Sequence, residues 1–457
     1  MTALASRLGG GLPAAYWKLW FASAGSNVAD GIFWVALPLL AITLTDSPAL
    51  VAGVTVASRL PWLLFALVAG ALADRLDRRR TMILVDLVRA VLLGALAAAT
   101  LAGVASLPLL YVVAFALGVA ETLFDTSAQS IMPNIVEGDR LNRANGRLYA
   151  VELTMNQFVG PPLGGFLAAI AIAAAFGTGA VAYLVAALAL FTIAGAFRPV
   201  REGPPTRIHH DIAEGLRYLF GHRLLRVLAI MVGIGNLASA AVFAIFVLYA
   251  VSPGPLGLDA VGFGLMTTAL AIGSLIGTFL VEPLERRLGR ANLLAISIAV
   301  TSSTLLAPAL TTNVPVIFAV WIFSGAIGIA WNVVTVSLRQ RIVPDALLGR
   351  VNATYRLLAW GTMPIGAFLG GIVGQTFGLP AVFLIFGGLE LALVLGRFVV
   401  TDEAIVAAEA RGRAEAAKVE AAAGARAEAA RAAAAAGAGP PPAAGATESG
   451  PATPTEP

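Results

Sequence analysis

Four charged residues lie inside stretches of the sequence that are otherwise strongly apolar. They are Asp30, Arg59, Glu121 and Asp125, and each falls near the middle of a long hydrophobic run. A charge at the centre of a lipid bilayer costs on the order of 2.5–3.5 kcal/mol on insertion scales, so a charge retained there indicates a function. Burial disfavours an ionised carboxylate and a nearby guanidinium favours it, so the two effects together can place titration near neutral pH. These residue types therefore predict reversible proton binding.

A fixed polar cluster is the alternative to proton binding. In that case Asp30 and Arg59 form a permanent ion pair, and Glu121 and Asp125 line a polar pocket without exchanging protons. Three carboxylates against one guanidinium leave at least one acid without a partner, which favours proton coupling by at least one of them.

Polar and aromatic residues accompany these charges at helical spacing. Asn27 and Trp34 share a helix face with Asp30, and Gln129 lies on the face of the two acids in the later run. The second half of the chain has few such charges, so we expect an apolar cavity wall there and a hydrophobic or amphipathic substrate. A single aromatic residue fits core packing equally well. The residues predicted to contact substrate are Asn27, Phe33, Trp34, Gln129, Asn236, Trp331 and Asn332, with Phe243, Phe246 and Trp360 as further aromatic candidates.

The composition defines the class of protein that positions these residues. Of 457 residues only 12% are charged and 58% are hydrophobic, whereas about a quarter of a soluble domain is charged. Between Glu152 and Arg198 lie 45 residues without a charge, and between Arg290 and Arg339 lie 48. A membrane helix needs roughly 20 apolar residues, so each gap fits two helices joined by a short turn. With no Cys, disulfides, thiolate metal sites and Cys nucleophiles are excluded.

The fold class predicted is an all-α membrane protein, because lipid requires each backbone polar group to be paired within its own helix. Turn signals and charge clusters divide the first 400 residues into twelve transmembrane helices. The expected spans are 17–44, 48–73, 81–103, 107–134, 149–175, 180–197, 225–250, 259–281, 291–310, 314–338, 353–376 and 380–400.

Basic residues indicate the orientation and the domain organisation. Nearly all Lys and Arg residues fall on one side of these spans, and the opposite connections, such as 103–107 and 177–179, carry none. The positive-inside rule then places both termini in the cytoplasm and the protein in the plasma (inner) membrane. Arg89, Arg356 and Arg397 are assigned to helix ends on the cytoplasmic side. The expected domains are a six-helix half over 1–197, a cytoplasmic linker over 198–224, a second six-helix half over 225–400, and a tail over 401–457 with an Ala/Glu/Arg-rich helix to residue 436 and a disordered end.

An internal sequence repeat supports two related halves. The segment 133–149 followed by GPPLGG (160–165) is matched by 344–356 followed by GAFLGG (366–371). Arg, Asn and the last Gly recur at offsets of 206 or 207 residues. Parallel repeats with a cavity between them are a transporter architecture, while convergent helix-end chemistry is the simpler alternative.

One loop carries a recognisable motif, GALADRLDRRR, between the second and third spans. It resembles the loop motif of the major facilitator superfamily, with Asp77 where the pattern has a second glycine. The chain is most similar to the macrolide-efflux and enterobactin-exporter-like branch of drug:proton antiporters. This resemblance implies a pseudo-symmetric twelve-helix fold, a proton-binding acid in the first helix, and a latch on the cytoplasmic side. The residues implied in that conformational gating are Gly70, Asp74, Arg75, Arg79 and Arg80; as an alternative, the Arg cluster only marks topology.

Glycines at four-residue spacing predict close helix packing, since small residues let backbones touch in lipid. By the resemblance, the fifth, eighth and eleventh helices that carry them lie between the halves, with hinge bending as a second possible role. The packing residues are Gly160, Pro161, Gly164, Gly273, Gly277, Gly366 and Gly370.

Other chemistry is not indicated. His209, His210 and His222 lie in the linker, where a solvated amphipathic stretch is favoured over adventitious metal binding. No catalytic triad, phosphate-binding loop or metal cluster is found, so we expect no enzyme activity, no cofactor, no nucleic-acid partner and a monomer in the bilayer.

The sequence therefore predicts a secondary active transporter that exports small amphipathic compounds in exchange for protons. Three alternatives remain. The chain could export a siderophore, it could import a solute on the same fold, or it could be a non-transporting scaffold or sensor that acts through its tail.

Overall fold

The computed structural model describes residues 11–73, 76–195, 197 and 208–437. This described part is helical, without strands, apart from a single bridge between Val251 and Leu258. Asp74 and Arg75 of the loop motif lie outside the described residues, as does the expected disordered end of the tail after residue 437.

The first part of the chain forms an N-terminal group of helices. Its elements are α2 (Ala14–Leu44), α3 (Pro48–Ala73), α4 (Arg78–Leu101), α5 (Leu107–Ile135), η1 (Gly138–Arg140), α6 (Leu141–Leu153), η2 (Thr154–Val159), α7 (Gly160–Ile170) and α8 (Ile172–Phe191).

The second part forms a C-terminal group, preceded by a linker helix and followed by a tail helix. The elements are α9 (Ile208–Gly221), α10 (Arg223–Ala250), α11 (Ala260–Leu288), α12 (Arg290–Leu310), α13 (Val314–Ile342), α14 (Asp345–Phe377), α15 (Leu379–Ala392), η3 (Leu393–Phe398) and α16 (Asp402–Gly437).

Eleven helices of the described chain are long and apolar enough to cross a membrane, rather than twelve. The difference is the expected fifth span, where a π-helical turn, η2, separates α6 from α7. Pro161 and Pro162 follow it and lack the N–H that would bond one turn back, and the N–H of Gly160 reaches five residues back to Met155 O. The turn to the next helix falls at Ala171, so the expected connection at 177–179 is wrong.

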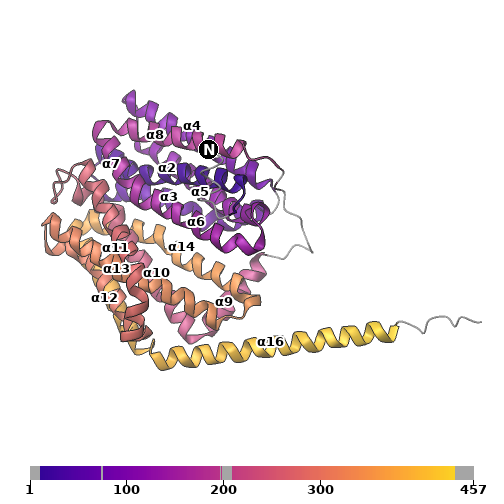
Figure 1. Ribbon diagram of the computed structural model, residues 1–457. Coiled ribbons are helices and arrows are strands. Elements are labelled where there is room, and N and C mark those ends of the chain that lie inside the picture. Colours follow the sequence, from indigo (N-terminus) through magenta and orange to yellow (C-terminus); the bar gives the residue numbers. More distant parts are fainter. Residues whose placement is uncertain (1–10, 74–75, 196, 198–207, 438–457) are drawn as a thin grey trace, which may run out of the picture.

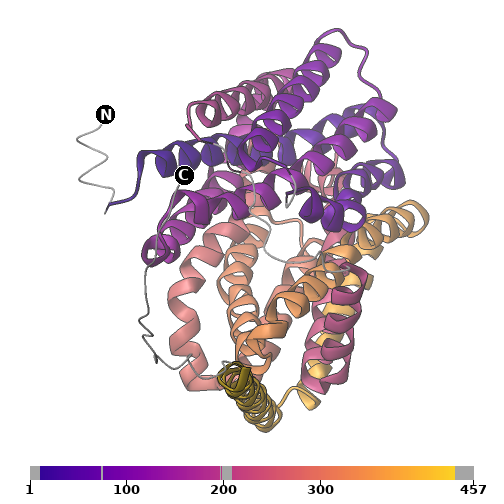
Figure 2. The same ribbon diagram turned by 90° about the vertical axis from the view of Figure 1, so that its right-hand side faces the viewer.

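The two groups lie against each other along their length. Figure 1 shows the indigo-to-magenta helices of the N-terminal group above the orange helices of the C-terminal group, and Figure 2 shows the same stacking from the side. α3 packs against α14, and α7 packs against α11, across the boundary.

The hydrophobic cores distinguish the two ends of the bundle. At the end that carries Arg78–Arg80, Arg286 and the start of α16, here called the basic end, each group has its own core. At the opposite end one continuous core joins the groups, with Val35 and Val54 on one side and Phe246 and Ala367 on the other. The groups are therefore packed together more completely away from the basic end.

The tail helix α16 begins at the basic end of the C-terminal group and runs away from it, as the yellow helix of Figure 1. The expected tail helix over 401–436 is thus present, and its first turns pack on α12 and α13.

Candidate functional site

A buried ionic cluster lies inside the N-terminal group, where α2, α4 and α8 meet. The hydroxyl of Tyr183 donates to Asp30 Oδ1 at 2.5 Å, and Arg89 Nη1 lies 3.8 Å from Asp30 Oδ2. The guanidinium also lies over the rings of Phe124 and Tyr183, 5.2 Å from each centroid. The Arg89 side chain is 1% exposed, whereas Asp30 is 15% exposed, so Asp30 is the more accessible of the two.

Asp86 is a second acid in this cluster. Its Oδ1 lies 3.7 Å from Arg89 Nη1 and accepts a hydrogen bond from Ser26 Oγ at 3.2 Å. Arg89 Nη1 donates to the same hydroxyl at 3.2 Å. Oδ2 of Asp86 and Nε and Nη2 of Arg89 are buried without a hydrogen-bond partner among the described residues. One guanidinium therefore stands nearly midway between two carboxylates and fully satisfies neither.

Arg89 and Asp86 are the members of this cluster that the sequence reasoning missed. The sequence predicted that Arg89 lies near a helix end. In the structure it lies eleven residues after the start of the 24-residue helix α4. The sequence does contain a signal for this pair, because Asp86 and Arg89 are three residues apart in an apolar helix and therefore lie on one face. The neighbouring Arg78–Arg80 cluster made them look like part of the basic helix end.

The other predicted charges lie around this cluster. Glu121 interacts electrostatically with Asp30, Arg59 and Arg89, and Asp125 interacts with Glu121 and Arg89. The proposed Asp30–Arg59 ion pair is absent from the described contacts. Arg59 instead lies over the ring of Trp34 with its Cζ 3.8 Å from the centroid, a cation–π contact.

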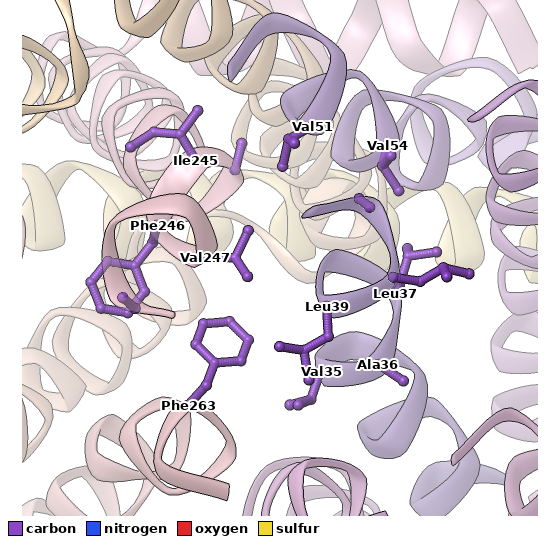
Figure 3. Packing of buried hydrophobic residues seen from close by; sticks show 14 of the residues in the cluster. Val35, Ala36, Leu37, Leu39, Val51, Val54, Ile245, Phe246, Val247 and Phe263 are labelled. Carbon is purple, nitrogen blue, oxygen red and sulfur yellow. The ribbon is translucent and has the colours of Figure 1, made fainter. Parts of the chain in front are cut away.

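A cavity of about 450 Å³ lies between the two helix groups. Trp34 and Arg59 line it from the N-terminal group, and Phe243, Phe246 and Phe263 line it from the C-terminal group. Figure 3 shows Phe246 and Phe263 facing Val35 and Leu39 across this region. Its C-terminal wall is mainly aromatic and aliphatic, with the hydroxyls of Ser239 and Thr267, and its charged residue comes from the N-terminal side.

Two polar residues in this cavity, Asn156 and Gln157, were not predicted. Both belong to the π-helical turn η2 and line the cavity beside Arg59. A π turn displaces side chains from the ordinary helical faces and is frequent at functional sites. The Gly-Pro-Pro that follows is the sequence feature that could have indicated it.

Several predicted contact residues lie elsewhere. Asn27 bonds back to Ser23 O at 2.9 Å, Phe33 is packed in the core, and Trp360 stacks edge-on against Trp62 with centroids 4.6 Å apart. Asn332 is exposed, and the side chain of Gln129 lies outside the described residues. Asn236 and Trp331 line a separate, smaller cavity inside the C-terminal group.

The glycines predicted to pack helices touch backbone at close range. A Cβ on Gly160 would lie 2.5 Å from Gly31 Cα, and one on Gly164 would lie 2.9 Å from Ile32 O, both on α2. A Cβ on Gly366 would meet Leu237, and one on Gly370 would meet Ala241, both on α10. On the other pair of helices, a Cβ on Gly273 would meet Ile322 and one on Gly277 would meet Ala326, both on α13.

These contacts lie within each group, whereas other residues of the same helices cross the boundary. Gly165 faces Ala260 and Gly264 of α11, Gly371 faces Ala52 of α3, and Pro161 lines the central cavity.

Residues 13–426 match the model of a family described as transmembrane secretion effectors, within the major facilitator superfamily. The chain belongs to this family. Its members and the relatives below are transporters rather than enzymes, and the chain is a multi-pass membrane protein.

Named relatives of this major facilitator protein are exporters. The chain is 27% identical over 394 residues to the multidrug efflux pump Tap of Mycolicibacterium fortuitum, covering 82% of this chain and 92% of the relative. It is 25% identical over 386 residues to the enterobactin exporter EntS of Salmonella typhimurium, covering 81% and 90%.

Solved structures share the major facilitator fold. The nucleoside transporter NupG matches with a TM-score of 0.68 and 14% identity, covering 85% of this chain and 99% of the other. An inward-facing bacterial homologue of the iron transporter ferroportin matches with a TM-score of 0.65 and 16% identity, covering 87% and 99%.

The superfamily's loop motif builds contacts inside the N-terminal group. Arg79 donates to the carbonyls of Leu190 and Phe191 at 3.0 and 2.6 Å, which caps the end of α8. Asp77, at the position that departs from the motif, caps α4 by accepting from Arg80 N at 3.0 Å and also accepts from Phe197 N at 3.0 Å. Gly70 lies in the last turn of α3. The motif's Arg79 and its substituted Asp77 thus hold α4 and α8 together.

Proposed function

We propose that the protein exports small amphipathic compounds in exchange for protons. The N-terminal group (α2–α8) and the C-terminal group (α10–α15) act as the two six-helix halves, with residues 141–170 as the fifth membrane helix. The basic end faces the cytoplasm, which follows from the positive-inside rule and puts both termini inside. The transporter acts as a monomer in the inner membrane.

The observation that carries the proposal is an excess of buried acid in the N-terminal group, linked to the central cavity because Glu121 interacts with Arg59, which lines that cavity. Asp30, Asp86, Glu121 and Asp125 stand against two guanidiniums, those of Arg59 and Arg89. A charge in a membrane interior is retained when it has a function, and an uncompensated carboxylate there favours its protonated form. At least one of these acids therefore binds a proton in one state of the cycle.

Arg89 gives the exchange a physical route. Its Nη1 lies at 3.8 and 3.7 Å from the two aspartates, so protonation of Asp30 leaves the guanidinium paired with Asp86. The buried positive charge then stays compensated in both states. Because Asp30 is the more exposed of the two aspartates, it is the acid we assign to proton exchange, ahead of Glu121 and Asp125.

Alternating access fits the way the groups pack. Their shared core and the 2.7 Å hydrogen bond from Ser47 Oγ to Gln375 Oε1 lie at the end away from the basic end. This arrangement is closed to the outside, and substrate would enter from the cytoplasm. Rocking of one half against the other would then expose the cavity to the outside.

Substrate chemistry follows from the cavity walls. Phe243, Phe246, Phe263 and Trp34 suit an apolar body, and Arg59 adds a charged group at the N-terminal wall. This fits the amphipathic drugs suggested by the name of the Tap relative. A second candidate, an anionic siderophore as in the name of the EntS relative, is favoured by Arg59 at the cavity wall.

Gradient-driven transport in proteoliposomes tests the proposal. We expect uphill movement of a cationic dye or a macrolide when a pH gradient is imposed, and no uphill movement without it. Catecholate siderophores provide the second arm. Transport that proceeds equally with and without the gradient contradicts proton coupling, and no transport of any class contradicts the exporter function.

A further inference from the structure

A further buried carboxylate lies in the C-terminal group, far along the chain from the ionic cluster. Glu390 of α15 is 7% exposed, and its Oε1 accepts a hydrogen bond from Thr301 Oγ1 at 2.8 Å. Its Oε2 is buried without a hydrogen-bond partner among the described residues. A buried polar atom without a partner lowers stability by about 1–3 kcal/mol, and by more when it is charged. Binding of a ligand at Oε2 would remove this penalty.

This carboxylate lines a cavity of about 190 Å³. The polar residues around it are neutral, namely Asn236, Ser239, Ser297 and Thr301, and Trp331 forms part of the wall. Ser239 also lines the central cavity, so the two cavities adjoin at this residue. An exchangeable species could reach Glu390 through this point.

The internal repeat places this cavity in register with the ionic cluster. Gly160 packs on Gly31, and the residues 206 positions later, Gly366 and Leu237, pack on each other in the same way. By this offset Asp30 corresponds to Asn236.

Equal positions along the remaining helices extend the correspondence. Arg89 and Thr301 each lie eleven residues after the start of α4 and α12. Tyr183 and Glu390 each lie eleven residues after the start of α8 and α15. The three residues that meet in the N-terminal group thus have counterparts around one cavity. The acid lies on α15 instead of α10, and a threonine hydroxyl takes the position of the guanidinium.

Loss of the guanidinium leaves Glu390 without a countercharge. Among the described residues, those of α10, α12 and α13 that line the cavity bring no other ionisable group. On α14, Arg350 pairs with Glu214 at 2.8 Å and Arg356 lies over Trp360. Beyond α15, Arg397 donates to Asn292 Oδ1 at 3.0 Å. An isolated carboxylate in such surroundings is not retained as a bare charge.

We propose that Glu390 is the centre of a second ion site, which binds one monovalent cation, either a proton or a sodium ion. A proton would neutralise Oε2 directly. Sodium would take Oε2 with neighbouring hydroxyl and amide oxygens, which are the ligands that hard cations prefer. The site does not depend on which compound the protein transports, and it holds its ion in the absence of substrate.

Infrared difference spectroscopy on the full-length protein in nanodiscs, without substrate, tests this site. In one arm pH is lowered in choline chloride, and in the other sodium chloride replaces choline chloride at constant alkaline pH. A protonated-carboxyl signal that appears in the first arm and is lost in Glu390→Gln identifies a proton. A carboxylate shift in the second arm that is lost in Glu390→Gln identifies sodium.

Two further variants keep the test independent of folding. Thr301→Val removes the hydroxyl bonded to Oε1 while keeping the acid, and should shift the Glu390 signal without abolishing it. Glu282→Gln removes an exposed acid that pairs with Arg286, and should leave the signal unchanged. The proposal is overturned if neither titrant produces a signal that depends on Glu390, whether or not the protein transports drugs.

Discussion

Tyr183 and Asp30, 153 residues apart in sequence, are joined by a 2.5 Å hydrogen bond deep in the N-terminal group. The phenol donates to one carboxylate oxygen, while Arg89 Nη1 lies 3.8 Å from the other. These two contacts hold the acid in place, and its side chain remains partly exposed.

Asp30→Asn should abolish gradient-driven efflux and leave substrate binding in place. The amide keeps the shape of the side chain but has no proton to exchange, whereas the cavity walls are unchanged. Efflux from proteoliposomes under an imposed pH gradient and dye binding to purified protein separate the two effects. Asp46→Asn, an exposed acid in the loop before α3, is the matched control. Wild-type uphill transport by Asp30→Asn would refute the assignment of Asp30.

Arg89→Ala should destabilise the protein by about 3–5 kcal/mol, because it leaves two buried carboxylates without their shared cation. Thermal unfolding in nanodiscs measures this loss. Adding Asp86→Asn should recover part of it, since one of the two uncompensated charges is then removed. If the double variant is as unstable as Arg89→Ala, the two residues do not interact energetically.

Parts of this site could be predicted from sequence and parts could not. Charges in apolar runs located Asp30, Glu121 and Asp125, because polarity in a membrane helix is visible without a structure. The partner of Asp30 was not visible, since helix rotation decides whether Arg59 or Arg89 faces it. Rotation depends on packing against neighbours such as Gly160 on Gly31, which no single helix encodes.

Arg59→Gln should change charge selectivity rather than transport in general. The guanidinium lies at the cavity wall on Trp34, a contact worth about 0.5–2 kcal/mol. Its loss should weaken binding of a catecholate siderophore and spare or improve binding of a cationic dye. Affinities for both, measured by tryptophan quenching, check this prediction. Equal losses for both ligands would indicate that Arg59 acts only on cavity shape.

Gly371→Ala should hinder closure of the end away from the basic end. The new Cβ would lie 2.7 Å from Ala52 Cβ on α3, and overpacking of this kind costs about 1–3 kcal/mol. The chain has no Cys, so Ser47→Cys with Gln375→Cys gives a clean crosslinking pair.

Oxidative crosslinking of that pair should be slower in Gly371→Ala than in the parent. Gly177→Ala is the control, because a Cβ there meets nothing within 4 Å. Unchanged crosslinking in Gly371→Ala would show that the interface adjusts around the methyl group.

Much of the helix plan followed from the sequence, since apolar length and turn residues set α2, α3 and α5 within a few residues of the expected spans. The exception is residues 141–170, where Pro161 and Pro162 remove backbone donors and a π turn forms. Hydropathy does not register a change in backbone hydrogen bonding. The repeat at 206 residues, by contrast, was visible as sequence and appears in the structure as matching contacts of Gly160 and Gly366.

The tail helix has a docked part and a projecting part, and truncation should separate them. Asp402 Oδ1 accepts from Ala291 N at 3.0 Å and caps α12, and Glu409 pairs with Arg290 at 2.6 Å. Glu415 accepts from the Tyr218 hydroxyl at 3.0 Å. Removing residues 425–457 should leave stability and transport unchanged, whereas removing 402–457 should lower stability by at least the roughly 0.5–2 kcal/mol of one helix cap. A scaffold that acts through its tail would lose function in both truncations.

Two glycines in this helix give a matched pair for the same point. A Cβ on Gly412 would collide with the Ile342 carbonyl oxygen, while one on Gly424 meets nothing within 4 Å. Gly424→Ala should raise helix stability by up to about 1 kcal/mol, since alanine is the better helix former, and Gly412→Ala should lower stability because α16 is pushed off α13.

Docking should also depend on pH in one direction. Burial, followed by the hydrogen bond to Glu415, raises the pKa of Tyr218 above its ordinary value of 10.0. A raised pKa means that the folded state holds the proton more tightly than the unfolded chain. The stabilisation is therefore complete below pH 10 and is lost as the pH rises through the folded-state pKa. Proteolysis of α16 from neutral to strongly alkaline pH, with Tyr218→Phe as the control, measures this. Accelerated cleavage that begins below pH 10 in the wild type alone would contradict the assigned donor role of Tyr218.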